Sequence, residues 1–246
     1  MSRFYLIGGH DFDSKNNYIA KRLLRLSHKE KPNILLIPLA SKDSERTISN
    51  FKREYNGLNY TLNILLLTKK PNCDEIKETI AQVDILFFSG GSTAFLIEFL
   101  KKNNLTWIIY DSLKREDLII AGVSAGAIML SRFGLTDQEA YEDHDNFYNY
   151  KELEGLGILD IGLCPHYNLN DRMLYFSDMV KNHSCDSYAL DEDTALYVEN
   201  GIYKPIYALK KRHIYQFKKD KQHIMEKMEL KKLITLVDLL KFRILS

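Results

Sequence analysis

The fold follows from one stretch, Leu118-Ile119-Ile120-Ala121-Gly122-Val123-Ser124-Ala125-Gly126. Its first part is a continuous apolar run of strand length, and the residues after the serine have a helical pattern. A strand that turns tightly into a helix predicts a βα unit. The turn itself fits G-x-S-x-G, the nucleophile elbow, in which glycines leave room for a tight bend and a serine hydroxyl stands above the end of a sheet. Ser124 is therefore the first candidate catalytic residue.

The same alternation extends outward from this unit. Strands are expected at 3–7, 33–39, 60–66, 84–89 and 118–123, and helices at 18–26, 44–55, 73–81, 94–103 and 125–131. Continuous apolar strands separated by helices predict a doubly wound α/β fold, with a mostly parallel sheet covered by helices on both faces. Ligands bind at the carboxyl ends of such strands. The loops expected there are 8–11, 40–43, 89–93 and 122–126.

The pattern changes after residue 135. Residues 136–150 are polar, acidic and aromatic, which indicates a surface loop. Residues 195–198 and 202–209 predict a β-hairpin, because Asn200-Gly201 supplies positive φ at its turn. A further strand at 213–217 and an amphipathic C-terminal helix with apolar positions between 224 and 240 complete the pattern. No linker is visible, so residues 1–246 are expected to form one domain.

Composition narrows the class of protein. The 246 residues are 45% hydrophobic and 27% charged, as in an ordinary globular protein. No apolar run approaches the ~20 residues that span a bilayer, and the N-terminus does not resemble a signal peptide, so we expect a cytoplasmic protein without a membrane partner. Cys73, Cys164 and Cys185 lack paired spacing, which predicts neither a disulfide framework nor a zinc site. No metal or organic cofactor is implied.

The net charge of +1 conceals two segregated regions. Residues 137–200 hold 15 acidic and 3 basic residues, whereas residues 201–246 hold 12 basic and 4 acidic residues. The acidic region disfavours a polyanion. The basic region interleaves its charges with acidic and apolar residues, which indicates a solvated face. We expect no nucleic-acid partner.

A nucleophilic serine requires a base, and the base requires an orienting acid. His166 is the favoured base among seven histidines, because an apolar strand-like segment delivers it just after Pro165. For the acid, Asp191-Glu192-Asp193 precedes a predicted strand, and Asp137 lies shortly after the serine helix. Residue types alone leave both possibilities open.

An acyl-transfer site also requires donors for a developing oxyanion. The amide of Ala125 begins the helix after Ser124, and the glycine-rich turn at 89–93 could offer the amide of Gly91. That turn is also compatible with phosphate binding. However, the lysine of a P-loop is missing, and the spacing fits no dinucleotide-binding motif.

Three segments together resemble the peptidase E family, which contains aspartyl dipeptidases and cyanophycinases. They are Phe87-Phe88-Ser89-Gly90-Gly91-Ser92-Thr93, Gly122-Val123-Ser124-Ala125-Gly126-Ala127 and Pro165-His166-Tyr167, and the resemblance covers about residues 1–210. It implies an α/β fold related to class I glutamine amidotransferases and a serine nucleophile.

Carried onto this chain, the resemblance implies roles for individual residues. Ser124 would be the nucleophile, His166 the general base, and Glu192 the acid, with Asp137 as the alternative acid. The Gly91 and Ala125 amides would form the oxyanion hole. Ser92, which replaces the family's usual asparagine, would bind substrate together with Thr93, and Arg172 would bind a substrate aspartate. The acidic residues at 137–145 would repel such a substrate.

The sequence therefore predicts a serine peptidase, monomeric or homodimeric, that hydrolyses short peptides with aspartate on the acyl side through an acyl-enzyme. One alternative is an α/β-hydrolase esterase, whose chain order would select Ser124, Asp193 and His213. The others are a catalytically silent binding module of the same fold and, last, a phosphate-binding protein built on Gly90-Gly91.

Overall fold

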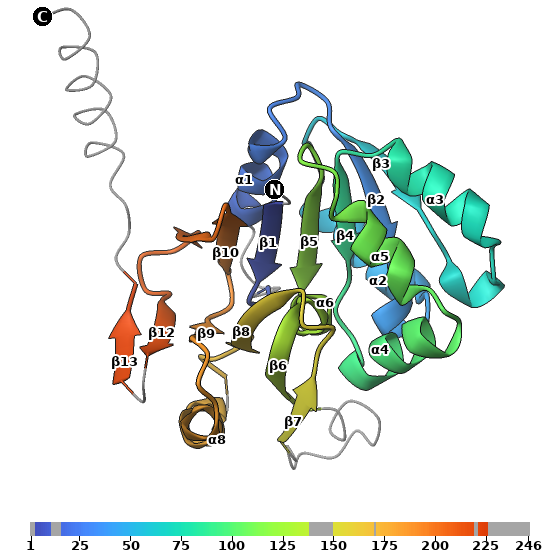
Figure 1. Cartoon of the computed structure of the whole chain (residues 1–246). Helices are drawn as coiled ribbons and strands as arrows, with labels where there is room; N and C mark the ends of the chain where they lie inside the picture. Colours follow the sequence, from blue (N-terminus) through green and yellow to red (C-terminus); the bar gives the residue numbers. More distant parts are fainter. Residues whose placement is uncertain (1–2, 11–15, 138–149, 170, 219–220, 226–246) are drawn as a thin grey trace, which may run out of the picture.

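A computed structural model describes residues 3–10, 16–137, 150–169, 171–218 and 221–225. Within these ranges the chain forms two β-sheets flanked by helices (Figure 1). Ile224, the first apolar position expected for the C-terminal helix, is instead in a strand, and the other positions of that helix lie outside the described residues. Nearly all of the expected loop at 136–150 also lies outside them. No described helix has the length and apolar character needed to cross a bilayer.

The larger sheet has seven strands in the order β11-β10-β1-β5-β4-β2-β3. The five strands from the first half of the chain pair in parallel, and β10 and β11 add an antiparallel edge. Their bounds are Arg3–Ile7 (β1), Asn33–Ile37 (β2), Thr61–Ile64 (β3), Ile85–Phe88 (β4), Ile119–Val123 (β5), Thr194–Glu199 (β10) and Ile202–Tyr207 (β11). At the β10–β11 turn, Asn200 and Gly201 both have positive φ, as the Asn-Gly pair requires.

Helices cover both faces of this sheet. Tyr18–Leu26 (α1) and Glu45–Glu54 (α2) pack on one face, where their apolar residues meet Ile34, Leu36 and Phe87. On the other face, Leu35, Ile37 and Phe88 contribute to a core with the remaining helices of the first half. These are Cys73–Ala81 (α3), Thr93–Lys102 (α4), Thr106–Ser112 (α5) and Ala125–Leu130 (α6). Burial on both faces explains why the strands are continuously apolar.

The second sheet was not predicted as a sheet, although the strand expected at 213–217 is one of its members. It has six strands in the order β13-β12-β9-β8-β6-β7, and Arg172–Met179 (α8) packs beside it. The strands are Ser131–Thr136 (β6), Lys151–Glu154 (β7), Leu159–Cys164 (β8), Ser187–Leu190 (β9), Ile214–Lys218 (β12) and Lys221–Ile224 (β13). The expected helix at 125–131 ends early because Ser131 starts β6. Edge strand β7 contains no apolar alternation, only Lys-Glu-Leu-Glu, so its sequence carries little strand signal.

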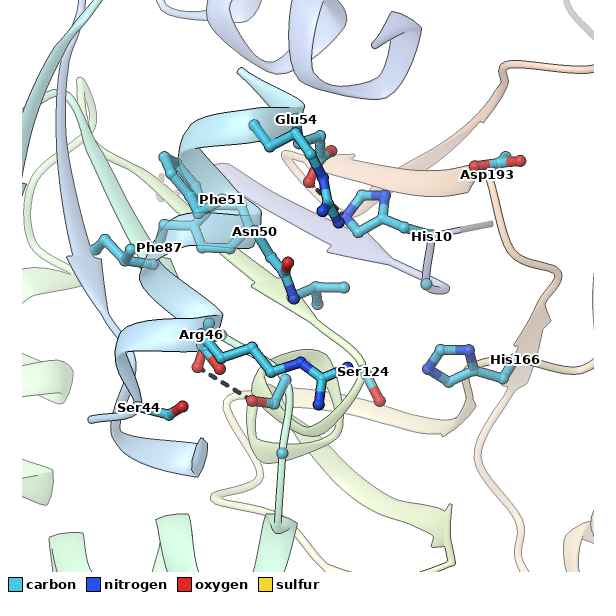
Figure 2. Close-up of a pocket in the computed structure, with 18 of the residues that line it drawn as sticks. His10, Ser44, Arg46, Asn50, Phe51, Glu54, Phe87, Ser124, His166 and Asp193 are labelled. Atoms are coloured by element: carbon cyan, nitrogen blue, oxygen red, sulfur yellow. Dashed lines mark hydrogen bonds and ion pairs between the residues drawn. The ribbon is translucent and has the colours of Figure 1, made fainter. Parts of the chain in front are cut away.

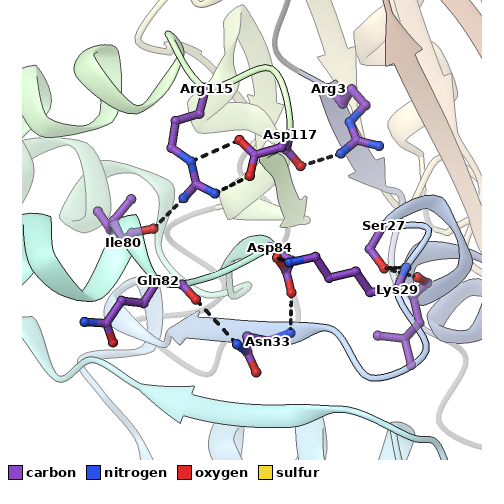
Figure 3. Close-up of polar contacts among 10 residues, drawn as sticks. Arg3, Ser27, Lys29, Asn33, Ile80, Gln82, Asp84, Arg115 and Asp117 are labelled. Carbon is purple, nitrogen blue, oxygen red and sulfur yellow. Dashed lines mark hydrogen bonds and ion pairs between the residues drawn. The ribbon is translucent and has the colours of Figure 1, made fainter.

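The amino ends of the parallel strands are joined by a polar network (Figure 3). The buried carboxylate of Asp84 accepts a hydrogen bond from the Asn33 amide (2.8 Å) and pairs with Lys29 Nζ (2.6 Å). Arg115 pairs with Asp117 at 2.6 Å and donates to the Ile80 carbonyl oxygen at 2.8 Å. These contacts connect elements at the end of the sheet opposite to Ser124.

Candidate active site

Ser124 lies in a sharp turn between β5 and α6, with φ +51° and ψ −111°. A non-glycine residue is uncommon at positive φ. The two flanking positions require glycine because a side chain there would clash with the backbone. A Cβ on Gly122 would lie 2.4 Å from Gly126, and a Cβ on Gly126 would lie 2.4 Å from the Phe88 carbonyl oxygen. The Ser124 amide donates to the Ile7 carbonyl oxygen (3.1 Å). The predicted strand–turn–helix at Ser124 is confirmed.

His166 is held in a comparable way after β8. It has φ +53°, and its amide donates to the Gly8 carbonyl oxygen at 2.8 Å. Its ring packs on Gly9, where an added Cβ would lie 2.3 Å from His166 Cε1. His166 Nδ1 lies 3.1 Å from Glu192 Oε1. The imidazole is thus oriented by one carboxylate, which leaves Nε2 for another partner.

The three consecutive acids that precede β10 point to different partners. Asp191 accepts from the His213 amide at 2.8 Å, and burial raises the pKa of its carboxyl. The amide of Glu192 donates to the Asn168 side chain, and its carboxylate faces His166. Asp193 has φ +57° and donates its amide to the Gly9 carbonyl oxygen. Of the three, Glu192 is placed with its carboxylate against a ring nitrogen of His166.

The two predicted oxyanion donors occupy turns at the ends of β4 and β5. Gly91 has φ +143°, and a Cβ there would lie 2.3 Å from the Ala40 carbonyl oxygen, so only glycine fits. The Ala125 amide begins α6 next to Ser124. Neither amide donates to a backbone carbonyl among the described residues. Gly91 lines the pocket that contains Ser124, whereas Ala125 is buried next to it.

A pocket of about 750 Å³ opens at this edge of the sheet (Figure 2). Ser124 and His166 lie on the same side of it, with the serine hydroxyl and the imidazole directed toward one another. Helix α2 forms the opposite wall, and Figure 2 labels Arg46, Asn50 and Glu54 along it. Three of the four loops expected at the carboxyl ends contribute lining residues: Gly9, His10, Ser89, Gly90, Gly91, Val123 and Ser124.

The model of the family described as Peptidase family S51 matches residues 4–206. The chain belongs to peptidase family S51, the peptidase E family. It is 30% identical over 195 residues to the uncharacterized peptidase YgaJ of Bacillus subtilis strain 168, covering 78% of this chain and 80% of that protein. It is 25% identical to the uncharacterized peptidase Lmo0363 of Listeria monocytogenes, over 58% of this chain and 69% of the other.

The fold is also that of solved peptidases. The crystal structure of a peptidase from an acI-B1 Actinobacterium superposes with a TM-score of 0.68 at 20% identity, covering 93% of this chain and 96% of that chain. The predicted resemblance to the peptidase E family is confirmed. Membership in this family supports a peptidase, and the pocket that contains Ser124 is its candidate active site.

Arg172 and Asp137, both predicted site residues, are paired with one another in this S51 peptidase. Arg172 is buried, forms an ion pair with Asp137, and lies 5.1 Å from the centre of the Tyr150 ring. It does not line the pocket with Ser124. Asp137 does line this pocket, but its carboxylate is paired with Arg172, whereas the carboxylate that contacts His166 is that of Glu192. This geometry disfavours Arg172 as a substrate ligand and Asp137 as the triad acid.

The S51 segment at Ser92 and Thr93 has a structural function. The Ser92 hydroxyl accepts from the Phe95 amide (3.2 Å) as the N-cap of α4, and Thr93 is the first residue of that helix. Both are buried, and neither lines the pocket among the described residues. A serine is a favourable N-cap, which gives a physical reason for Ser92 that does not involve a substrate.

The alternative triad of Ser124, Asp193 and His213 is not assembled. His213 does not line the pocket; its Nδ1 lies 3.9 Å from Asp191 Oδ2. Sequence reasoning also missed the contribution of α2 to this S51 site. The signal was present in the spacing: Arg46, Asn50 and Glu54 recur every four residues, on a stripe separate from the buried Ile48 and Phe51.

A second pair of titratable side chains lines the pocket. His10 Nε2 is 3.0 Å from Glu54 Oε2. Burial lowers the pKa of His10, but the charge and hydrogen bond of Glu54, together with Asp193 and Glu192, outweigh it and raise the pKa overall. The positive form of His10 is therefore favoured next to Glu54, and the two charges of this pair balance one another.

Proposed function

We propose that this S51 peptidase is a serine peptidase that uses Ser124, His166 and Glu192. The observation that carries the proposal is the placement of Ser124 and His166 in one pocket, with His166 Nδ1 3.1 Å from Glu192 Oε1. A nucleophile, a base and an orienting acid in this order are the requirements of acyl transfer. The resemblance to the peptidase E family favours the same three residues.

In the first half of the reaction, Ser124 Oγ attacks the carbonyl carbon of the scissile peptide bond while His166 Nε2 takes its proton. The negative oxygen of the tetrahedral intermediate accepts hydrogen bonds from the Gly91 and Ala125 amides. His166 then gives the proton to the leaving nitrogen, and the carbon–nitrogen bond breaks. The products are a free amine and an ester between the acyl residue and Ser124.

In the second half, water attacks the ester carbon while His166 takes a proton from it. The second tetrahedral intermediate collapses, the proton passes to Ser124 Oγ, and the carboxylic acid leaves. Glu192 holds the ring so that Nε2 faces the serine and stabilises the positive imidazole formed twice in each cycle. No metal or cofactor is needed to balance these steps.

The proposed substrates are short peptides with aspartate on the acyl side, and the proposed site of action is the cytoplasm. A pocket of about 750 Å³ suits a small molecule rather than an extended polypeptide. Aspartate preference is the expectation given by the resemblance. It requires a cation near the acyl residue, because a carboxylate is bound most strongly by a charged donor.

The test compares hydrolysis of Asp-Leu, other dipeptides and a simple ester by the wild type and by S124A, H166A and H213A. We expect S124A and H166A each to lower kcat on Asp-Leu by about 10⁴- to 10⁶-fold, and H213A to leave it within a few-fold. In parallel, a fluorophosphonate probe should label the wild type but not S124A. Ester cleavage that survives H166A and is lost in H213A would instead support the esterase triad.

A further inference from the structure

We propose that Arg46 is the specificity residue of this site, binding a carboxylate carried by the acyl residue of the substrate. Arg46 lies in the first turn of α2, and its side chain lines the same pocket as Ser124 (Figure 2). The proposal rests on the proposed function for its reaction, but it concerns a different residue from those of the triad.

The charged side chains around the pocket are unequally paired. Among the acids that line it, Glu54 pairs with His10 and Asp137 pairs with Arg172. Glu192, which does not itself line the pocket, pairs with His166. The exposed guanidinium of Arg46 has neither a hydrogen bond nor an ion pair to any residue that the structure describes. A substrate carboxylate would supply the missing partner, in the bidentate geometry that arginine favours.

The local backbone strengthens this attraction. Arg46 is at the amino end of a ten-residue helix, where unpaired amides and the helix dipole give a positive potential. The only acid in that first turn is Glu45, which does not line the pocket. An anionic group beside Arg46 is therefore attracted both by the guanidinium and by the amino end of α2.

The positions of Ser124 and His166 determine which part of the substrate meets Arg46. His166 must give its proton to the leaving nitrogen, so the leaving group lies on the His166 side of Ser124. The acyl residue then extends to the other side. In Figure 2 the guanidinium of Arg46 lies across Ser124 from His166, together with Asn50. Arg46 is thus placed to contact the acyl residue rather than the leaving group.

The deciding experiment compares R46Q with K52Q. Lys52 is exposed on the same helix and does not line the pocket, so K52Q removes one positive charge without changing the site. For R46Q we expect kcat/KM on Asp-Leu to fall about 10- to 150-fold, which corresponds to about 1.5–3 kcal/mol for a hydrogen bond to a charged group. Hydrolysis of Asn-Leu, whose acyl residue is the neutral isostere, should stay within about 3-fold.

Three controls keep this outcome specific. K52Q should change neither substrate by more than about 2-fold, and R46K should recover part of the Asp-Leu activity because it retains a point charge. Asp-Leu amide, which lacks the terminal carboxylate, should respond to R46Q as strongly as Asp-Leu does. An equal loss on Asp-Leu and Asn-Leu, or a loss on Asp-Leu that disappears with Asp-Leu amide, would overturn the proposal.

A binding measurement separates this proposal from the proposed function. L-Aspartate should protect wild-type Ser124 from the neutral fluorophosphonate probe, L-asparagine should protect less, and R46Q should lose the difference while its labelling rate without competitor stays unchanged. No labelling of the wild type would contradict the serine mechanism itself. Normal labelling with equal protection by the two amino acids would contradict only the assignment of Arg46.

Discussion

At the carboxyl ends of the strands, polar side chains point into an open pocket, whereas at the amino ends of the same strands they are paired with one another. Ser124 and His166 hold positive φ angles and face the cavity. Asp84 at the other end is buried and accepts from one backbone amide and one lysine. At the open end a pair such as His166 with Glu192 orients a group that faces the cavity, whereas at the other end the pair of Asp84 with Lys29 serves stability alone.

The largest expected effect concerns the two candidate acids at the open end. We expect E192Q to lower kcat by about 10³- to 10⁴-fold, because the amide no longer orients and stabilises the His166 imidazole. D137N should instead keep kcat within about 5-fold and lower the free energy of unfolding by about 1–3 kcal/mol, since buried Arg172 loses its charged partner. Kinetics and urea denaturation of both variants measure this. The reverse pattern would restore Asp137 as the acid.

The next largest effect concerns the packing of the His166 ring on Gly9. We expect G9A to lower kcat by about 10²-fold, because the new Cβ would lie 2.3 Å from the His166 ring and displace it. G57A is the matched control: Gly57 also has positive φ, but a Cβ there meets nothing within 4 Å. Its cost should appear in stability alone. Equal activity of the two variants would show that His166 does not need this contact.

At the paired end the effect should be on stability only. D84A should reduce the free energy of unfolding by about 1–3 kcal/mol, because the Asn33 amide and Lys29 lose their acceptor. D84N keeps an acceptor and should cost less. For both variants kcat/KM should match that of the wild type, as measured on folded protein. A loss of activity without loss of stability would mean that the two ends are coupled.

The smallest effect is a pH dependence at the pocket. The pKa of His10 is raised above its ordinary value of about 6.5, so the pair with Glu54 stabilises the fold fully at lower pH and loses this contribution as the pH rises through the raised pKa. The stability difference between the wild type and E54Q should therefore be largest below about pH 6.5, at under about 1 kcal/mol, and shrink above it.

Thermal or urea unfolding between pH 5.5 and 9 measures this dependence. E78Q is a suitable control because Glu78 is exposed on α3, away from the pocket. A difference between the wild type and E54Q that grew with pH would contradict the raised pKa.

Much of the architecture could be predicted because local signals agreed with one another. The continuous apolar runs and intervening helices determine a parallel sheet, and α3 begins and ends at the predicted residues, Cys73 and Ala81. Helix α5 was missed, because seven residues that include Trp107, Ile108 and Ile109 have too little polar pattern to distinguish a helix from a loop. In the second sheet the strand at 213–217 was predicted and is β12. The sheet as a whole was missed because its short strands depend on neighbours for their stability rather than on their own pattern.

For the site, the sequence by itself determined the nucleophile turn. Gly122-Val123-Ser124-Ala125-Gly126 can form only with small residues on both sides, and that requirement is local. The tertiary structure decided the rest. It pairs Glu192 rather than Asp191 with His166, gives Asp137 to Arg172, and brings Arg46 from α2 over the pocket. These pairings depend on strand register and on which carboxylate faces which cation. They join residues far apart in the chain, so the local spacing of either partner does not predict them.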